Sequence, residues 1–260
     1  MIKVGVLGAQ GRMGSQACQT VESAPDLELT AQVDVGDPIE GLAGCDVVVD
    51  FTHPGAVMDN VRWCVGHGIT VVAGTSGFDA GRLAEVGTWL AEAAASAEAD
   101  SSAEAAPAPV RVLVVPNFSV GAVLMMRFAQ QAAPFFESTE VIELHHAAKA
   151  DAPSGTATRT AAMVEEARSA AGLGASPDAT TAETDGARGA VLGGVHVHSV
   201  RLAGLVAHQE VLLGGHGELL TIRHDSLDRS SFMPGVLLAV RGVGSLPPGL
   251  TVGLDSLLGV

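Results

Sequence analysis

The stretch MIKVGVLGAQGRMGS at residues 1–15 decides the fold of the first part of this 260-residue chain. It opens with a short, apolar, β-branched segment, Ile2–Leu7, of the kind that forms a buried parallel strand. Gly8, Gly11 and Gly14 follow with the spacing G-x-x-G-x-x-G. Glycines at the start of a helix allow a tight turn and a close backbone approach to a pyrophosphate, which the helix N–H groups then bind. The stretch predicts a dinucleotide site, and a purely structural strand–helix turn is the alternative.

A carboxylate stands where a dinucleotide site needs one. The next predicted strand, Leu27–Val33, ends at Asp34, which is 20 residues beyond Gly14. A carboxylate at this place accepts hydrogen bonds from the adenine ribose and repels a 2′-phosphate. No arginine follows it directly, which favours NADH, whereas Arg12 in the glycine turn keeps NADPH open. The predicted cofactor is therefore NADH or NADPH.

Strand and helix patterns alternate through the rest of the first part. A helix is predicted over about Met13–Ser23, and further helical patterns lie near His53–Gly66 and Gly81–Ala93. This alternation predicts an α/β fold with a Rossmann-like, doubly wound parallel sheet. The remaining predicted strands of this sheet are Val47–Phe51, Ile69–Ala73 and Val110–Val115.

Small polar residues follow three of these strands. They are Phe51-Thr52, Gly74-Thr75-Ser76-Gly77 and Pro116-Asn117-Phe118-Ser119. Because ligands of open parallel sheets bind at the carboxyl ends of the strands, these residues are expected to line the ribose and nicotinamide sites. Each taken alone is also compatible with an ordinary turn.

The middle of the chain has longer strand patterns with partial alternation and predicts a second, α+β domain with an open mixed sheet. A helix, Gly155–Ala170, follows the first of these strands, and residues 172–194 are rich in turn signals. The strands are predicted at Thr139–His146, Val195–Leu202, Val206–Leu213 and Glu218–His224.

The end of the chain is expected to return to the first domain. A helix beginning near Asp228 leads to a last strand at Leu250–Leu254. We therefore predict a dinucleotide-binding domain formed by residues 1–118 and 228–260, and a substrate-binding and oligomerisation domain at 119–227. Residues 91–109 are of low complexity and are expected to prolong the preceding helix and then form a solvated loop.

Composition excludes several classes of partner. The formal net charge is −15, which argues against nucleic acid and anionic membranes, because both need a basic face. No apolar run is long enough for a membrane span, and the glycine-rich start has no signal-peptide core. Three cysteines without metal-ligand spacing suggest buried thiols in a reducing cytosol. These features predict a cytoplasmic protein without a cysteine metal site.

The densest polar motif is HHAAKADAPSGTA at residues 145–157, and it holds Lys149, one of only two lysines in the chain. The other cations are twelve arginines. Guanidinium effectively never gives up its proton, whereas an ammonium can do so. A lysine in this motif therefore suggests proton chemistry.

The same motif contains a predicted anion site. Pro153 restrains the chain before a helix, and Ser154 is suited to cap it, so the N–H groups of Gly155 and Thr156 point outward. His145 and His146 end a strand on opposite faces, so one of them is expected to face the site. Zinc is disfavoured because no third ligand lies at a suitable spacing. A plain helix cap is the alternative.

Over nearly its whole length, the chain resembles the 4-hydroxy-tetrahydrodipicolinate reductase (dihydrodipicolinate reductase) family of bacterial lysine and diaminopimelate synthesis. The segments that carry the resemblance are VGVLGAQGRMG, DFTHP, GTSG, PNFSVG, ELHHAAKADAPSGTA and VRLAGLVAHQEVLLG. The resemblance implies NAD(P)H-dependent reduction of a cyclic dicarboxylate, with hydride transfer followed by protonation. It also implies a homotetramer joined through the sheets of the second domain.

The resemblance assigns roles to individual residues. His145 and Lys149 become the acid–base residues, and His146, Gly155 and Thr156 become substrate binders. The positions that it implies for cofactor contacts, together with the strand tip Phe51, are Gly8, Ala9, Gln10, Gly11, Arg12, Met13, Asp34, Gly74, Thr75, Ser76, Val115, Pro116, Asn117 and Phe118.

Two other functions remain open at this point. A dehydrogenase for another small dicarboxylate keeps the enzyme class, but one of the aspartate-semialdehyde type needs a nucleophilic cysteine, and all three cysteines lie within the first 64 residues. A non-catalytic dinucleotide-sensing protein needs no proton donor, whereas Lys149 is present. The residues do not settle whether His145 or Lys149 delivers the proton.

Overall fold

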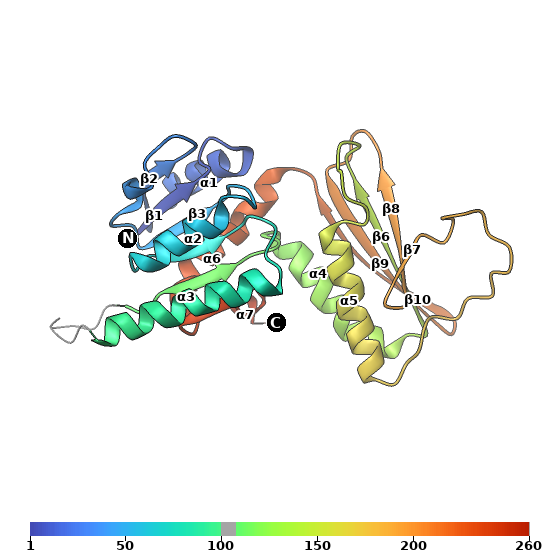
Figure 1. Ribbon diagram of the computed structural model, residues 1–260. Helices are drawn as coiled ribbons and strands as arrows, with labels where there is room; N and C mark the ends of the chain where they lie inside the picture. The colour runs from blue at the N-terminus through green and yellow to red at the C-terminus, as the bar shows by residue number, and fades with distance from the viewer. Residues whose placement is uncertain (100–107, 260) are drawn as a thin grey trace. The chain divides into compact units, whose positions relative to one another are not determined.

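The computed structural model describes residues 1–99 and 108–259 of the chain, which divide into two compact units (Figure 1). The first unit consists of Met1–Phe118 and Phe232–Gly259, and the second of Ser119–Ser231. The helix expected to run into the low-complexity segment continues to Ala99. The loop expected after it falls outside the described residues.

The first unit is built on a six-stranded sheet with the order β11-β5-β4-β3-β1-β2, and every strand pair in it is parallel. This arrangement confirms the predicted Rossmann-like sheet. The strands are β1 Ile2–Leu7, β2 Leu27–Val33, β3 Val47–Asp50, β4 Thr70–Ala73, β5 Arg111–Val114 and β11 Gly249–Val252. The α-helices are α1 Arg12–Glu22, α2 Val57–Gly66, α3 Ala80–Ala99, α6 Met233–Gly242 and α7 Asp255–Leu258, and the short 3₁₀ helices are η1 Ile39–Leu42 and η4 Val243–Ser245.

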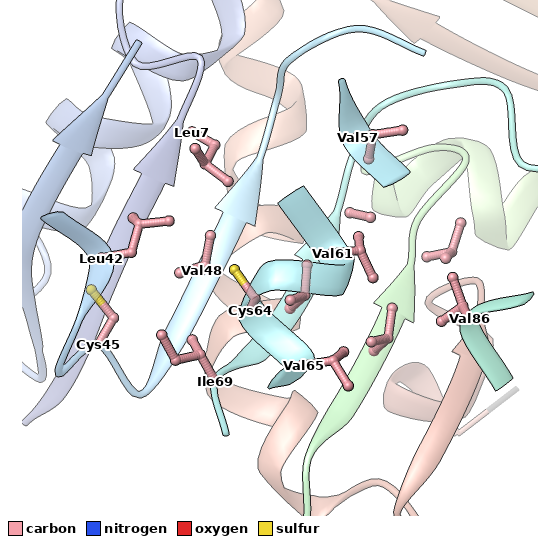
Figure 2. Close-up of a cluster of buried hydrophobic side chains, with 14 of the residues drawn as sticks. Leu7, Leu42, Cys45, Val48, Val57, Val61, Cys64, Val65, Ile69 and Val86 are labelled. Atoms are coloured by element: carbon pink, nitrogen blue, oxygen red, sulfur yellow. The ribbon is translucent and has the colours of Figure 1, made fainter. Parts of the chain in front are cut away.

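The core of this unit follows from strands that are covered on both faces. All four residues of β3 are buried, as a continuous Val-Val-Val run in a parallel sheet predicts. Figure 2 shows how Val48 of this strand lies among Leu42, Val61 and Cys64. Burial of each such aliphatic side chain contributes about 1.5–3 kcal/mol. The three cysteines are free and buried, so they serve here as small apolar side chains.

The second unit contains a five-stranded mixed sheet with the order β10-β9-β6-β8-β7. Strands β6 and β8 are parallel, and the other pairs are antiparallel. Helices α4 (Val120–Ala132) and α5 (Gly155–Ala170) lie against one face of the sheet (Figure 1), and their Ala129 and Ala161 share a core with Val141 and Val211. The strands are β6 Ser138–His145, β7 Ala190–Leu192, β8 Val195–Arg201, β9 Ala207–Gly215 and β10 Glu218–Ser226, with 3₁₀ helices η2 Ala133–Phe135 and η3 Arg229–Phe232.

The structure adds elements that the sequence patterns did not predict. Helix α4 begins at Val120, within the PNFSVG segment, and Ser119 caps it by accepting a hydrogen bond from the backbone N–H of Ala122. The short strand β7 lies in the turn-rich segment. The second unit runs to Ser231, whereas the sequence analysis placed the boundary at Asp228. No helix among the described residues is long and apolar enough to cross a membrane.

Candidate functional site

The glycine turn between β1 and α1 is built so tightly that only glycine fits. Gly8 has a φ of +74°, and a Cβ atom on Gly14 would lie 2.0 Å from the carbonyl oxygen of Gly8. Gly11 precedes α1 and provides no side-chain hydrogen bond to its first turn. The first-turn N–H groups are therefore available for an anion, as in dinucleotide sites.

Asp34, which follows β2, is hydrogen-bonded to this turn. Its Oδ2 accepts a hydrogen bond from the Gln10 backbone N–H at 2.6 Å, and its Oδ1 accepts one from the Val35 N–H at 2.8 Å. These backbone hydrogen bonds, with that from Val35 the larger influence, lower the pKa of Asp34. The carboxylate is therefore ionised and fixed beside the glycine turn.

A second close approach lies at the ends of β3, β4 and β5. A Cβ atom on Gly74 would come within 2.5 Å of the Phe51 ring and 2.6 Å of the Phe118 ring, and the two ring centroids are 5.4 Å apart. Val115 and Phe118 are both buried. Pro116 and Asn117 lie between them and are more accessible.

A buried carboxylate, Asp50, organises these strand ends. Its exposed fraction is 0%. Its Oδ1 accepts hydrogen bonds from the Thr52 N–H and hydroxyl at 2.8 and 2.6 Å and from the Thr75 hydroxyl at 3.0 Å. Its Oδ2 accepts one from the Asn60 amide at 2.8 Å. One carboxylate thus holds two of the segments that the sequence assigned to cofactor binding.

In the second unit, a His–Glu pair ends strand β6. Nδ1 of His145 lies 2.5 Å from Oε2 of Glu143, because alternate residues of a strand share one face. Glu143 is fully buried, and the His145 side chain is 14% exposed. His145 therefore has one ring nitrogen engaged by the protein and an edge that solvent can reach.

Arg201, the last residue of β8, completes this cluster. Its two terminal nitrogens each donate to Glu143, to Oε2 and Oε1 respectively, both at 2.8 Å. One of them also donates to the Asp151 carbonyl oxygen at 2.5 Å. The parallel pairing of β6 with β8, which sets His145 opposite Arg201, explains the contact.

The cluster changes the pKa values of its acidic and basic groups. Burial disfavours the charged form of Glu143, but hydrogen bonds from Arg201, Ser199 and His145 outweigh it and lower the pKa of this carboxyl to about 2. Burial lowers the pKa of His145, with Lys149 and Arg201 acting in the same direction and Glu143 opposing them. Glu143 is thus an anion at neutral pH, and His145 is easily deprotonated.

The loop after β6 brings Lys149 beside a carboxylate. Its Nζ donates a hydrogen bond to Oδ1 of Asp151 at 2.7 Å. The backbone turns there, because the Lys149 N–H donates to the His146 carbonyl oxygen at 3.1 Å. His146 itself is exposed. The hydrogen bond to Asp151 lowers the pKa of that carboxyl.

Helix α5 starts next to the same loop. Ser154 caps it by accepting the Ala157 N–H at 3.1 Å, and the Ser154 N–H donates to Oε1 of Glu143 at 3.1 Å. Beyond its chain neighbours and its own helix backbone, nothing lies within 4 Å of a Cβ atom built on Gly155, so the space beside this residue is open. Thr156 follows in the first turn. This is the geometry of a carboxylate or phosphate site at a helix start.

The predicted residues thus fall into two groups, one in each unit. The glycine turn, Asp34 and the strand ends belong to the first unit, while His145, His146, Lys149, Gly155 and Thr156 all lie between the end of β6 and the start of α5. The sequence analysis gave no role to four residues that organise these groups. They are Asp50, Glu143, Asp151 and Arg201.

One of the four had a visible signal in the sequence. Glu143 precedes His145 by two positions in a predicted strand, and that spacing puts a carboxylate and an imidazole on one face. The other pair of strand histidines, His196 and His198, lies near Asp178 and Glu140. Among residues 1–99 and 108–259, no group of three His, Cys, Asp or Glu side chains is placed to hold a metal ion.

Known proteins match the chain in both units. The family model described as dihydrodipicolinate reductase, N-terminus, matches residues 2–100, and that described as dihydrodipicolinate reductase, C-terminus, matches residues 121–258. The 4-hydroxy-tetrahydrodipicolinate reductase of Nocardia farcinica is 62% identical over 259 residues, which are 99% of this chain and 98% of that protein. The enzyme of the same name from Thermobifida fusca is 60% identical over the full length of both chains.

A solved structure matches the fold as well. Dihydrodipicolinate reductase from Paenisporosarcina sp. TG-14, determined with dipicolinate bound, has a TM-score of 0.83 and 36% sequence identity. The match covers 98% of this chain and 99% of that one.

Proposed function

The chain belongs to the dihydrodipicolinate reductase family, an oxidoreductase family of lysine and diaminopimelate biosynthesis, and we propose that it reduces 4-hydroxy-tetrahydrodipicolinate, via dihydrodipicolinate, to tetrahydrodipicolinate. The family prediction made from the sequence is confirmed. The observation that carries the proposed activity is the grouping of His145, Lys149 and an open helix start around the buried Glu143.

The helix start of α5 and the loop before it are the proposed substrate site. One carboxylate of the substrate accepts hydrogen bonds from the N–H groups of Gly155 and Thr156, where the helix end also favours a negative charge. The second carboxylate binds near His146 and Lys149. Two charged anchors fix the orientation of a ring, and orientation alone accounts for a large part of a catalysed rate.

His145 and Lys149 are the proposed acid–base residues. Reduction of a conjugated imine adds a hydride to the ring, and the product requires a proton from the protein. The pKa of His145 is lowered, so its ring is mainly neutral at neutral pH and readily gives up a proton once it is charged. Lys149 carries both a charge that attracts a carboxylate and a proton that it can give. Asp151 holds its ammonium in the free protein.

The residues of the first unit fit a pyridine nucleotide, which membership of the family implies. The proposed contacts are the glycine turn from Gly8 to Met13 for the pyrophosphate, Asp34 for the adenine ribose, and the strand ends at 51, 74–76 and 115–118 for the rest. When bound, the reduced nicotinamide supplies the hydride. The ionised Asp34 repels a 2′-phosphate, so we propose that NADH serves at least as well as NADPH.

The proposed assembly is a cytoplasmic homotetramer joined through the sheets of the second unit. Strand β10 supports this, because Leu219 is 66% exposed on it. Light scattering is the test, and the expected mass is about four times the 26.3 kDa of one chain. A mass of one chain over the concentrations used in assays contradicts the proposal.

Two alternatives make different predictions in one assay. Oxidation of NADH or NADPH is followed while the substrate is generated by the enzyme system that forms dihydrodipicolinate. The proposed function requires cofactor oxidation that depends on that system. A dinucleotide-sensing protein binds the cofactor without oxidising it. A dehydrogenase for another dicarboxylate oxidises it only with a different substrate.

A further inference from the structure

Glu143 joins the two parts of the proposed substrate site through a single buried carboxylate. Its Oε2 contacts His145, the proposed proton-exchanging residue. Its Oε1 accepts the N–H of Ser154, the residue that caps the anion-binding helix. Its exposed fraction is 0%. A side chain in this position sets where the imidazole lies relative to the helix start.

The carboxylate also sets the tautomer of His145. An ionised carboxylate only accepts hydrogen bonds, so the proton of the neutral ring is on Nδ1 and points to Glu143. Nε2 is then the ring nitrogen that exchanges protons with a ligand. The Ser-His-Asp triad uses a buried carboxylate on Nδ1 for the same purpose.

Arg201 supplies the positive charge that stabilises the buried carboxylate of Glu143. It donates to both oxygens of Glu143 at 2.8 Å, a bidentate geometry that only arginine provides. A further hydrogen bond, to the Asp151 carbonyl oxygen, reaches the loop that carries Lys149. Three segments thus converge on one ion pair: the end of β6, the loop at 149–151 and the start of α5.

We propose that Glu143 and Arg201 are positioning residues of the reductase site, which hold His145 with its Nε2 free for the ligand and keep it in register with the helix start of α5. The inference rests on the proposed function of His145. It adds that the geometry of the proton-exchanging group depends on an ion pair that does not touch the substrate.

A second Glu–Arg–His cluster, whose glutamate also lies on β6, provides a matched control for the Glu143 variant. Glu140 contacts Arg188 at 2.5 Å and Nε2 of His198 at 2.7 Å. It lies three residues before Glu143 and therefore on the other face of β6, and it makes no contact with the loop or with α5 that is seen in the described residues. Glu140→Gln removes the same charge without touching the proposed site.

The test is the Glu143→Gln variant. The amide keeps one acceptor oxygen where Glu143 has two. With that oxygen in the place of Oε1, it accepts from Ser154 and one Arg201 nitrogen, and its NH₂ group faces His145 and the other Arg201 nitrogen. Nδ1 must then accept, and the ring proton moves to Nε2. A comparable change in a serine protease lowers kcat about 10⁴-fold, and we expect a fall of at least about 100-fold in kcat with the KM for the dinucleotide unchanged.

NMR of the histidine rings measures the tautomer of His145 independently of catalytic activity. The ¹⁵N chemical shifts of the ring report which nitrogen is protonated, and the His145→Asn variant identifies the signals. We expect the neutral wild-type ring to carry its proton on Nδ1, the Glu143→Gln variant to carry it on Nε2, and Glu140→Gln to match wild type. A wild-type ring protonated on Nε2, or one unchanged by Glu143→Gln, overturns the inference.

The pH titration of His145 is a second test, because two variants are expected to shift its midpoint in opposite directions. The charged groups that act on it are Glu143 on its own strand, Arg201 on β8, and Lys149 on the loop, whose ammonium is paired with Asp151. Glu143→Gln removes an attracting anion and must lower the pH midpoint of His145, whereas Arg201→Gln removes a repelling cation and must raise it. A cluster with only a structural role gives loss of activity without these opposite shifts.

Two further experimental results separate failure of this inference from misfolding of a variant and from failure of the proposed function. If Arg201→Gln does not fold, Arg201→Lys keeps the charge and loses the bidentate geometry, and it must lower kcat while leaving the midpoint near that of wild type. If the wild-type protein shows no reductase activity at all, the proposed function fails, and the tautomer measurement still decides whether Glu143 positions His145.

Discussion

The ammonium of Lys149 donates a hydrogen bond to the carboxylate of Asp151 over 2.7 Å, two positions along the same loop. A dicarboxylate bound at the proposed site competes with Asp151 for this ammonium. Under the proposed function, Lys149 exchanges the carboxylate of Asp151 for that of the substrate and brings a proton close to the ligand.

Lys149→Arg keeps the positive charge and removes the transferable proton. If Lys149 delivers the proton, kcat falls by about 10²–10⁴-fold, the usual contribution of general acid catalysis, with a much smaller change in the KM for the dicarboxylate. Steady-state kinetics with both substrates varied is the measurement. The control is Lys3→Arg, the same exchange at the other lysine, which is exposed. Near-normal turnover of Lys149→Arg makes Lys149 an anchor and leaves the proton to His145.

Asp34→Asn keeps the shape of the side chain and removes its charge. Because the carboxylate repels a 2′-phosphate, the variant is expected to raise the NADPH-to-NADH ratio of kcat/KM by about tenfold. The control is Asp26→Asn, just before β2 at its opposite end, where the carboxylate pairs with Arg241. An unchanged cofactor ratio in Asp34→Asn, or a strong NADPH preference in wild type, contradicts the role given to Asp34.

Asp50→Asn disturbs the strand ends from within. The carboxylate accepts from Thr52, Asn60 and Thr75, and an amide cannot accept from all of them, so at least one buried donor is left unsatisfied at a cost of about 1–3 kcal/mol. We expect weaker dinucleotide binding, by about tenfold, and a lower free energy of unfolding. Asp46→Asn is the control, since Asp46 precedes the same strand and its carboxylate accepts the Lys3 N–H at 2.8 Å, away from the strand ends. Equal dinucleotide affinities in the two variants count against this role.

Much of this architecture follows from local sequence patterns. The parallel sheet of the first unit and helix α5 lie where alternation and capping residues predicted them, because buried strands and helix starts have local signatures. Helix α4 was missed, since the apolar run of residues 120–132 follows a segment that was interpreted only as a strand end. Strand β7 is three residues long and too short to give a periodic signal.

The organising contacts of the site were harder to predict. Arg201 reaches Glu143 only because β6 and β8 pair in parallel with His145 opposite Arg201, and no local pattern states the register of strands so far apart in the chain. Asp50 likewise meets Thr75 across neighbouring strands. The residues proposed to touch a ligand lie in a recognisable motif, whereas those proposed to position them depend on tertiary pairing.

Glu143 makes the stability of the second unit depend on pH in the acid range. Its pKa in the folded chain is about 2, below the value near 4.3 of an unfolded glutamate, so its contribution is fully present above the unfolded value and is lost as the pH falls toward 2. The difference in free energy of unfolding between wild type and Glu143→Gln should therefore shrink as the pH is lowered from 6 toward 3. Urea unfolding across this range measures it. A difference that grows on acidification contradicts the assigned pKa.

The most direct test of the proposed activity is cofactor oxidation with the substrate generated in place. Purified protein is mixed with NADH or NADPH and with the enzyme system that forms dihydrodipicolinate, and the absorbance of the reduced cofactor is followed. The account predicts a loss of absorbance that requires both the generating system and this protein, and that is strongly reduced in a double variant lacking both proposed acid–base groups, His145→Asn with Lys149→Met. No loss of absorbance with either cofactor would contradict it.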